Sequence, residues 1–243
     1  MSKQEISEKH TTKIEFPETI NRDLVRWCVI SAVGKESLHR EWLHKKALFD
    51  LHLIVYDDSY EIYKDDSTFI TQSKGQKFKL IYEYLTQHPD LFDQYDYFYC
   101  PDDDILINHD QIHRLFNCMF HYKLDIAQPA IFNSFWSYPH TAKHSNSILR
   151  YTNFVEIMQP CFSRAAIQKV LFTFNENESG WGIDFHWGKL VNFRKKNMAI
   201  IDDVISVHTR LVRSSHQQEL NEYLLKHQLN RKIIELHKDD HGM

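Results

Sequence analysis

Three consecutive carboxylates, Asp102, Asp103 and Asp104, are the residues whose type and spacing first suggest chemistry. Adjacent anions repel one another and each is favoured by hydration, so their convergence in a folded cleft requires a compensating charge. A hard divalent cation, which prefers oxygen ligands, is the commonest one. In an extended segment Asp102 and Asp104 point the same way and Asp103 points away. The alternative interpretation is a solvated acidic turn.

The elements around the triplet predict where it lies in a fold. Residues 95–100 are mostly aromatic and typical of a buried strand, which Pro101 ends because it cannot donate to a ladder. Residues 24–33 and 51–56 are apolar runs that suit strands buried on both faces. Polar residues lie at the end of each predicted strand: Ser31 and Gly34 at the first, Asp57 and Asp58 at the second and the triplet at the third. Ligands of parallel sheets bind beyond the carboxyl ends of strands, so these groups are candidates for one site.

Helical patterns alternate with these strands. Phe78, Ile81, Tyr82 and Leu85 have the i, i+3, i+4, i+7 spacing of one helix face. Asn108, with a glutamine three residues later, is a predicted N-cap for a helix over 109–120. A short strand at 124–130 follows. The alternation predicts an α/β fold with a mainly parallel sheet flanked by helices.

The second half is less regular. We expect a long loop or flap at 132–152, a strand at 154–162 and a helix capped by Ser163. Residues 180–187 lead into another helix, two short strands cover 198–203 and 204–209, and a terminal helix spans about 215–237. Residues 1–20 are polar and predicted to be a loose arm.

Composition excludes some classes of function. The 243 residues are 42% hydrophobic and carry a formal charge of −4, so no overall basic field indicates nucleic-acid binding. No apolar run is long enough to cross a bilayer, and the first residues lack an apolar signal segment. Four widely spaced cysteines predict reduced thiols in a cytoplasmic protein.

Taken together, the motifs resemble the GT-A class of nucleotide-sugar glycosyltransferases, whose Asp-x-Asp motif Asp102–Asp104 matches. The second half is similar to an uncharacterised plant and bacterial family, grouped with GT-A enzymes, whose plant members are labelled lysine-ketoglutarate reductase trans-splicing-related. The resemblance extends over about residues 95–210, and its ordered pieces are 128–130, 155–166, 181–185 and 201–208.

The resemblance implies a metal site and a base. Asp104 would ligate Mn²⁺ or Mg²⁺, Asp102 the metal or a ribose, and His208 would be a third ligand or else a packed or surface histidine. Asp184, in Gly-Trp-Gly-Ile-Asp, would be the general base of an inverting transfer. Its alternative role is a helix-dipole partner. Trp181 would stack on a sugar or belong to the core.

Other roles follow from the class of fold. Glu156 would bind acceptor hydroxyls or pair with Arg164. Ser31, Gly34 and Asp57 would lie near base and ribose, and Asp103 beside the nucleotide. Lys77 would meet phosphate or remain solvated. The resemblance divides one domain, 21–243, into a nucleotide-binding half (21–108) and an acceptor-side half with the C-terminal helix (109–243).

The predicted function is metal-dependent transfer from a nucleotide-sugar, with a UDP-sugar favoured, to a saccharide or glycolipid acceptor of polysaccharide biosynthesis. Two alternatives remain: a metal-dependent hydrolase using the Asp102–Asp104 cluster, and a non-catalytic nucleotide-sugar-binding protein. The donor sugar, the stereochemical outcome, the oligomeric state and peripheral membrane contact stay open.

Overall fold

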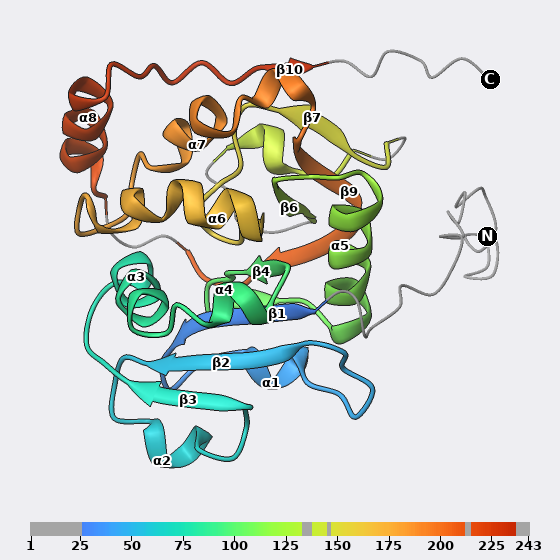
Figure 1. Ribbon diagram of the computed structural model, residues 1–243, viewed down its shortest axis with the longest axis vertical. Helices are drawn as coiled ribbons and strands as arrows, with labels where there is room; N and C mark the ends of the chain where they lie inside the picture. The colour runs from blue at the N-terminus through green and yellow to red at the C-terminus, as the bar shows by residue number, and fades with distance from the viewer. Residues whose placement is uncertain (1–25, 133–137, 145–146, 212–214, 237–243) are drawn as a thin grey trace, which may run out of the picture.

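A computed structural model describes residues 26–132, 138–144, 147–211 and 215–236 (Figure 1). Within these residues a ten-stranded sheet is covered by helices on both faces. The expected loose arm, residues 1–20, lies outside the described part of the chain.

The strand order and pairing of the sheet can be compared with the parallel character predicted from the sequence. Its strands follow the order β10 (Glu235–Leu236), β7 (Arg150–Thr152), β9 (Met198–His208), β6 (Ile126–Ile131), β8 (Cys161–Ser163), β4 (Tyr97–Tyr99), β1 (Trp27–Val33), β2 (Asp50–Val55) and β3 (Phe69–Gln72). β5 (Ile105–Leu106) pairs antiparallel with β9 beside this path. β3, β2, β1 and β4 pair in parallel, as do β6 and β9, whereas β7 and β8 run antiparallel to their neighbours. The sheet is therefore mainly parallel, as expected.

Two apolar layers hold the helices to the sheet. The helices are α1 (His39–Trp42), α2 (Tyr60–Tyr63), α3 (Lys77–Gln87), α4 (Leu91–Gln94), α5 (His109–His121), α6 (Arg164–Val170), α7 (Asp184–Val191) and α8 (Gln217–Lys226), with 3₁₀ turns η1 (Pro139–Thr141), η2 (Leu171–Asn175) and η3 (Phe193–Lys195). In β1, Cys28 and Ile30 join the core under α3, α6 and α7, whereas Val29 and Val33 join the core under α1 and α5. The alternation of side chains along a strand thus supplies both cores.

The predicted helix starts are confirmed. The Asn108 side chain accepts a hydrogen bond from the Gln111 N–H at 3.0 Å, and Ser163 Oγ accepts one from the Ala166 N–H at 3.2 Å. Each cap satisfies a backbone donor that has no partner within its own helix.

Several predicted boundaries are wrong. The strand expected at 154–162 is formed only by β8, because Pro160 cannot donate to a ladder and the chain before it takes an irregular path. The terminal helix ends at Lys226, and Gln228 has a left-handed φ of 53°, so the chain continues extended to β10. The two strands expected at 198–209 are one long strand, β9. α2 and β3 were not predicted, since four residues carry little periodic signal.

The described cysteines, Cys28, Cys100, Cys118 and Cys161, are all buried free thiols, as the sequence predicted. Across the described ranges, every helix is too short or too polar to span a bilayer.

Candidate active site

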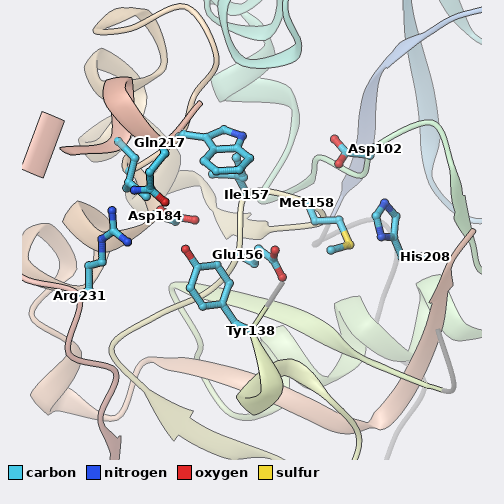
Figure 2. A pocket seen from close by; sticks show the side chains of 12 residues that line it. Asp102, Tyr138, Glu156, Ile157, Met158, Asp184, His208, Gln217 and Arg231 are labelled. Carbon is cyan, nitrogen blue, oxygen red and sulfur yellow. The ribbon is translucent and has the colours of Figure 1, made fainter. Parts of the chain in front are cut away.

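Two adjoining clefts open where the parallel strands end. β1, β2, β4, β6 and β9 run in the same direction, so their carboxyl ends meet at one edge of the sheet. The larger cleft has a volume of about 430 Å³ (Figure 2). Its lining residues are Asp102, Tyr138, Glu156, Ile157, Met158, Trp181, Gly182, Asp184, His208, Gln217, Leu220 and Arg231.

The smaller cleft, of about 370 Å³, lies on the β1–β4 side of the same edge. Its lining residues are Ala32, Tyr56, Gly75, Gln76, Lys77, Asp102, Asp103 and Asp104. Asp102 lines both clefts, so the triplet forms the boundary between them.

Asp102 and Asp104 each have a cationic or titratable partner. Lys77 Nζ lies 2.7 Å from Asp102 Oδ1 and also donates to the carbonyl oxygens of Ile157 and Met158, so Lys77 is not the solvated lysine of the alternative interpretation. His208 Nε2 lies 3.2 Å from Asp104 Oδ2. Burial raises the pKa of Asp102, and Lys77 opposes that rise.

Asp103 has a different function in the turn. Its carboxylate accepts hydrogen bonds from the Gly34 N–H (2.9 Å) and the Tyr56 hydroxyl (2.8 Å), and Arg210 lies 3.1 Å away. The segment is a turn and not the extended chain that we expected, so Asp103 points inward to the end of β1. Groups of the protein therefore offset part of the carboxylate repulsion for which we expected a bound cation.

The donor set at the triplet nevertheless fits a divalent cation. Asp104 Oδ1 is buried and accepts no hydrogen bond from the described residues, so it retains a lone pair available to a cation. Two carboxylates and an imidazole suit Mn²⁺, and the carboxylates alone suit Mg²⁺. Among the described residues, the donor atoms of Asp102, Asp104 and His208 do not all lie within 4.8 Å of one another. Asp102 is paired with Lys77, so a cation bound by all three residues would require a rearrangement of this pair.

A second carboxylate pair lies at the other end of the larger cleft, as Figure 2 shows. Asp184 and Glu156 are 3% and 4% exposed. Burial, and next the negative charge of Glu156, raise the pKa of Asp184 to about 8, although the Phe185 N–H donates to its Oδ1 at 3.0 Å. The pairing of Glu156 with Arg164 that we considered is wrong, since Arg164 pairs with Asp96 at 2.5 Å.

The Gly-Trp-Gly turn positions this carboxylate. Gly180 and Gly182 have φ values of 77° and 99°, a region that favours glycine. A Cβ on Gly182 would lie 3.1 Å from Leu220 and 3.3 Å from Tyr223, so α8 packs directly against the turn. Trp181 is half-buried and lines the cleft, and Asp184 begins α7.

The residues expected near base and ribose, Ser31, Gly34 and Asp57, have structural contacts at the ends of β1 and β2. Ser31 is fully buried and donates to the Pro101 carbonyl oxygen at 2.9 Å. Gly34 leaves space for the Tyr56 ring, which would lie 2.5 Å from a Cβ there. Asp57 accepts from the Lys35 N–H at 2.8 Å and from Ser59. Of the residues predicted for the nucleotide, Lys77, Asp102 and Asp103 line a cleft.

Three polar lining residues of the larger cleft were not predicted: Tyr138, Gln217 and Arg231. Tyr138 follows residues 133–137, which lie outside the described part of the predicted flap. Gln217 opens α8 and Arg231 follows it, in a region that we expected to be one continuous helix. No local pattern marks these residues, because long-range packing brings them to the cleft: α8 packs against the Gly-Trp-Gly turn, and the Tyr138 ring packs on Phe154 and Phe185.

The strand order, the flanking helices and the clefts at the strand ends define a GT-A-like fold, and solved structures are similar to it. The structure titled "S. aureus TarS 1-349 in complex with UDP-GlcNAc" matches with a TM-score of 0.58 and 13% identity, over 82% of this chain and 64% of that one. The same S. aureus protein in complex with UDP matches with a TM-score of 0.51 and 11% identity, over 84% and 72%. A third structure, titled "S. aureus TarS 1-349" with no ligand named, matches with a TM-score of 0.51 and 11% identity, over 76% of this chain and 60% of that one. In two of these three matches the chain spans less than two thirds of the TarS chain. At these identities the likeness establishes the fold.

A family model described as a protein of unknown function (DUF707) matches residues 142–239. The matched region includes α7, β9 and α8 and overlaps the stretch that carried the sequence resemblance. No curated protein matches the chain.

Proposed function

We propose that the protein is a metal-dependent glycosyltransferase that uses a nucleotide-sugar donor. The observation that carries this proposal is one cleft with Asp102 and His208 at one end and two buried carboxylates, Asp184 and Glu156, at the other. Donor and acceptor must meet in such a transfer, and the cleft provides a separate group of polar side chains for each.

The donor would occupy the clefts at the triplet. Asp102, Asp104 and His208 would hold Mn²⁺ or Mg²⁺, and Lys77 would contact phosphate. The bound cation would neutralise charge on the leaving diphosphate. A UDP-sugar is the proposed donor, which is supported by the ligands named for the S. aureus structures of similar fold.

The acceptor would occupy the end lined by Asp184, Glu156 and Trp181. In an inverting transfer the acceptor hydroxyl oxygen bonds to the anomeric carbon while the bond from that carbon to the diphosphate oxygen breaks. The electron pair leaves with the diphosphate, and the hydroxyl proton moves to the Asp184 carboxylate. Trp181 offers an apolar face to a sugar ring, and Glu156 would orient hydroxyl groups.

The acceptor class is a saccharide or glycolipid, and the setting that we propose is cytoplasmic polysaccharide biosynthesis. The label carried by the plant proteins of similar sequence corresponds to no chemistry at these residues. A screen of UDP-, GDP- and CMP-sugars for released nucleotide, with and without Mn²⁺, tests the proposal. Release that requires one donor, the metal and an added saccharide supports it, and no release or binding with any donor contradicts it.

One observation favours a hydrolase as the second candidate. Asp184, with its pKa raised beside Glu156, resembles the protonated acid of a glycosidase carboxylate pair. The products distinguish the two functions. A hydrolase releases free sugar without any saccharide acceptor, whereas a transferase yields an extended saccharide.

A further inference from the structure

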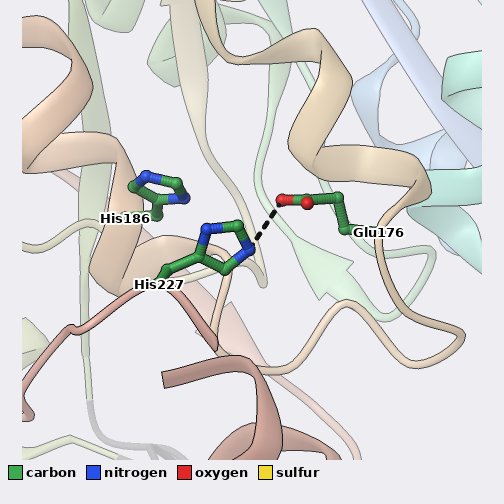
Figure 3. Close-up of side chains that lie close together, drawn as sticks. All are labelled: Glu176, His186 and His227. Carbon is green, nitrogen blue, oxygen red and sulfur yellow. Dashed lines mark ion pairs between the residues drawn. The ribbon is translucent and has the colours of Figure 1, made fainter. Parts of the chain in front are cut away.

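A second cluster of potential metal ligands lies behind the acceptor end of the cleft. Glu176 follows η2, His186 lies in α7 and His227 ends α8 (Figure 3). Their donor atoms lie within 4.8 Å of one another. His186 is 7% exposed, and its ring lies 4.6 Å from that of His227. His227 Nε2 lies 3.1 Å from Glu176 Oε2.

The hydrogen bonds define the tautomer of His186 in the metal-free arrangement. Tyr223 donates its single hydroxyl proton to Glu176 Oε2 at 3.0 Å. The contact of 3.0 Å between the Tyr223 oxygen and His186 Nδ1 then requires His186 to donate from Nδ1. In this neutral tautomer the lone pair is on Nε2, so metal binding through Nδ1, the nitrogen beside Tyr223, would require the proton to move to Nε2 and the contact with Tyr223 to break.

We propose that Glu176, His186 and His227 form a binding site for Zn²⁺ or a related late transition metal. Two imidazoles and one carboxylate are typical zinc ligands, whereas Mg²⁺ and Ca²⁺ prefer oxygen. Zinc at about 2.1 Å from each donor requires the donors to be about 3.4 Å apart. Glu176 Oε2 and His227 Nε2, 3.1 Å apart, are already that close, and the His186 donor lies within 4.8 Å of the other two ligands. The proposal is independent of the transfer reaction.

Lys226 is the cation that pairs with Glu176 in the metal-free arrangement. Its Nζ lies 2.9 Å from Glu176 Oε1 and supplies positive charge to the carboxylate in the metal-free arrangement. The Lys226 side chain is 58% exposed, so it can turn into solvent when a cation binds.

The three ligands come from separate elements, and this gives the site a structural role. α8 contributes Leu220 and Gln217 to the cleft and packs on the Gly-Trp-Gly turn before Asp184. A metal joining η2, α7 and α8 would fix this wall of the acceptor end, and its binding would stabilise the folded state by linkage.

Zinc titration of the full chain carrying Asp104→Ala tests the proposal, because that substitution removes a ligand of the cation site at the triplet. We expect one equivalent of Zn²⁺ to bind and to raise the melting temperature. Adding His186→Gln or His227→Gln should weaken zinc affinity at least tenfold and abolish the shift. Adding His121→Gln, at an exposed position in α5, should change neither.

His227 is only partly buried, so His227→Gln decides the question if His186→Gln fails to fold. Absence of zinc binding in the Asp104→Ala chain would overturn the proposal. Unchanged zinc affinity in a folded His227→Gln chain would also overturn it.

Discussion

At the scale of single residues, Asp184 is the side chain whose environment gives the sharpest expectations. It is buried beside Glu156, and its pKa is raised to about 8. A base must be ionised to accept a proton, so turnover should rise with pH through about 8 and level off above it. An acid, as in the hydrolase alternative, would produce the opposite slope. The measurement is the pH profile of turnover at saturating donor and metal; a profile that falls through pH 8 contradicts the role of base.

Removal of this carboxylate should affect the chemical step and leave donor binding unchanged. Asp184→Asn keeps the size of the side chain but cannot accept the proton, so turnover should fall by about 10²–10⁴-fold. Donor affinity, measured by calorimetry, should stay within about twofold of wild type, because Asp184 lies at the end of the cleft away from the triplet. Glu178→Gln, at an exposed carboxylate, is the control. Wild-type turnover in Asp184→Asn would leave Asp184 as a helix-dipole partner and make Glu156 the next candidate.

The same carboxylate should make stability depend on pH. Below about pH 4 Asp184 is protonated in both the folded and unfolded states, so its ionisation does not change the free energy of unfolding. Between about pH 4 and 8 the unfolded state ionises while the folded state does not, so stability falls as pH rises. Asp184→Asn should therefore have a higher melting temperature than wild type at pH 8, and this gain should shrink towards pH 4. Thermal unfolding at both pH values checks it, and a pH-independent difference would contradict the raised pKa.

His208 is tested by the choice of metal. Its imidazole nitrogen suits Mn²⁺ better than Mg²⁺, which demands oxygen ligands. His208→Ala should therefore lower the apparent affinity for Mn²⁺ in nucleotide binding by tenfold or more. The apparent affinity for Mg²⁺ should fall by less. Calorimetric titrations with each metal provide the measurement, and His121→Ala is the control. Equal losses of affinity for Mn²⁺ and Mg²⁺ would contradict a role as metal ligand and would indicate that His208 only stabilises the turn at Asp104.

At the scale of elements, the Gly-Trp-Gly turn joins the acceptor end to α8. Gly182→Ala places a Cβ at a φ of 99° and 3.1 Å from Leu220, so it should destabilise the protein by about 1–3 kcal/mol. Gly75→Ala, outside the left-handed region, should cost less. Chemical denaturation measures both. An equal or smaller loss for Gly182→Ala would show that the turn relaxes without strain.

Long elements with strong patterns could be predicted from the sequence, and short ones could not. β1, β2, α3 and α5 each bury a clear apolar face, and the caps of α5 and α6 involve neighbours three residues apart. β8 has three residues, and its pairing with β4 and β6 depends on contacts far away in the sequence. The end of α8 at Lys226 is followed by a left-handed backbone conformation at Gln228 that composition does not reveal.

The candidate site was predictable where chemistry is local. The triplet Asp102–Asp104, His208 and Asp184 stand in recognisable motifs. What the sequence could not reveal is the set of partners: Lys77 on Asp102, Arg210 on Asp103 and Glu156 beside Asp184. These partners lie 25, 107 and 28 residues away in the chain, and only the folded sheet brings them together.

At the scale of the whole molecule, the two halves of the chain meet at the triplet. The parallel strands β1, β2 and β4 lead to the smaller cleft, and β9, α7 and α8 contribute lining residues to the larger one. Asp102 belongs to both clefts. A ligand with a nucleotide at one end and a sugar at the other matches this layout, which is why binding of the nucleotide is the central claim.

Calorimetric titration of UDP into wild type and Asp104→Ala, with Mn²⁺ and with chelator, tests that claim most directly. Asp110→Ala, at an exposed carboxylate of α5, is the matched control. We predict binding that requires Mn²⁺ in wild type and Asp110→Ala, with loss of affinity of at least tenfold in Asp104→Ala at an unchanged fold. Wild-type affinity in Asp104→Ala, or UDP binding that is indifferent to Mn²⁺, would contradict a metal-dependent nucleotide site at the triplet.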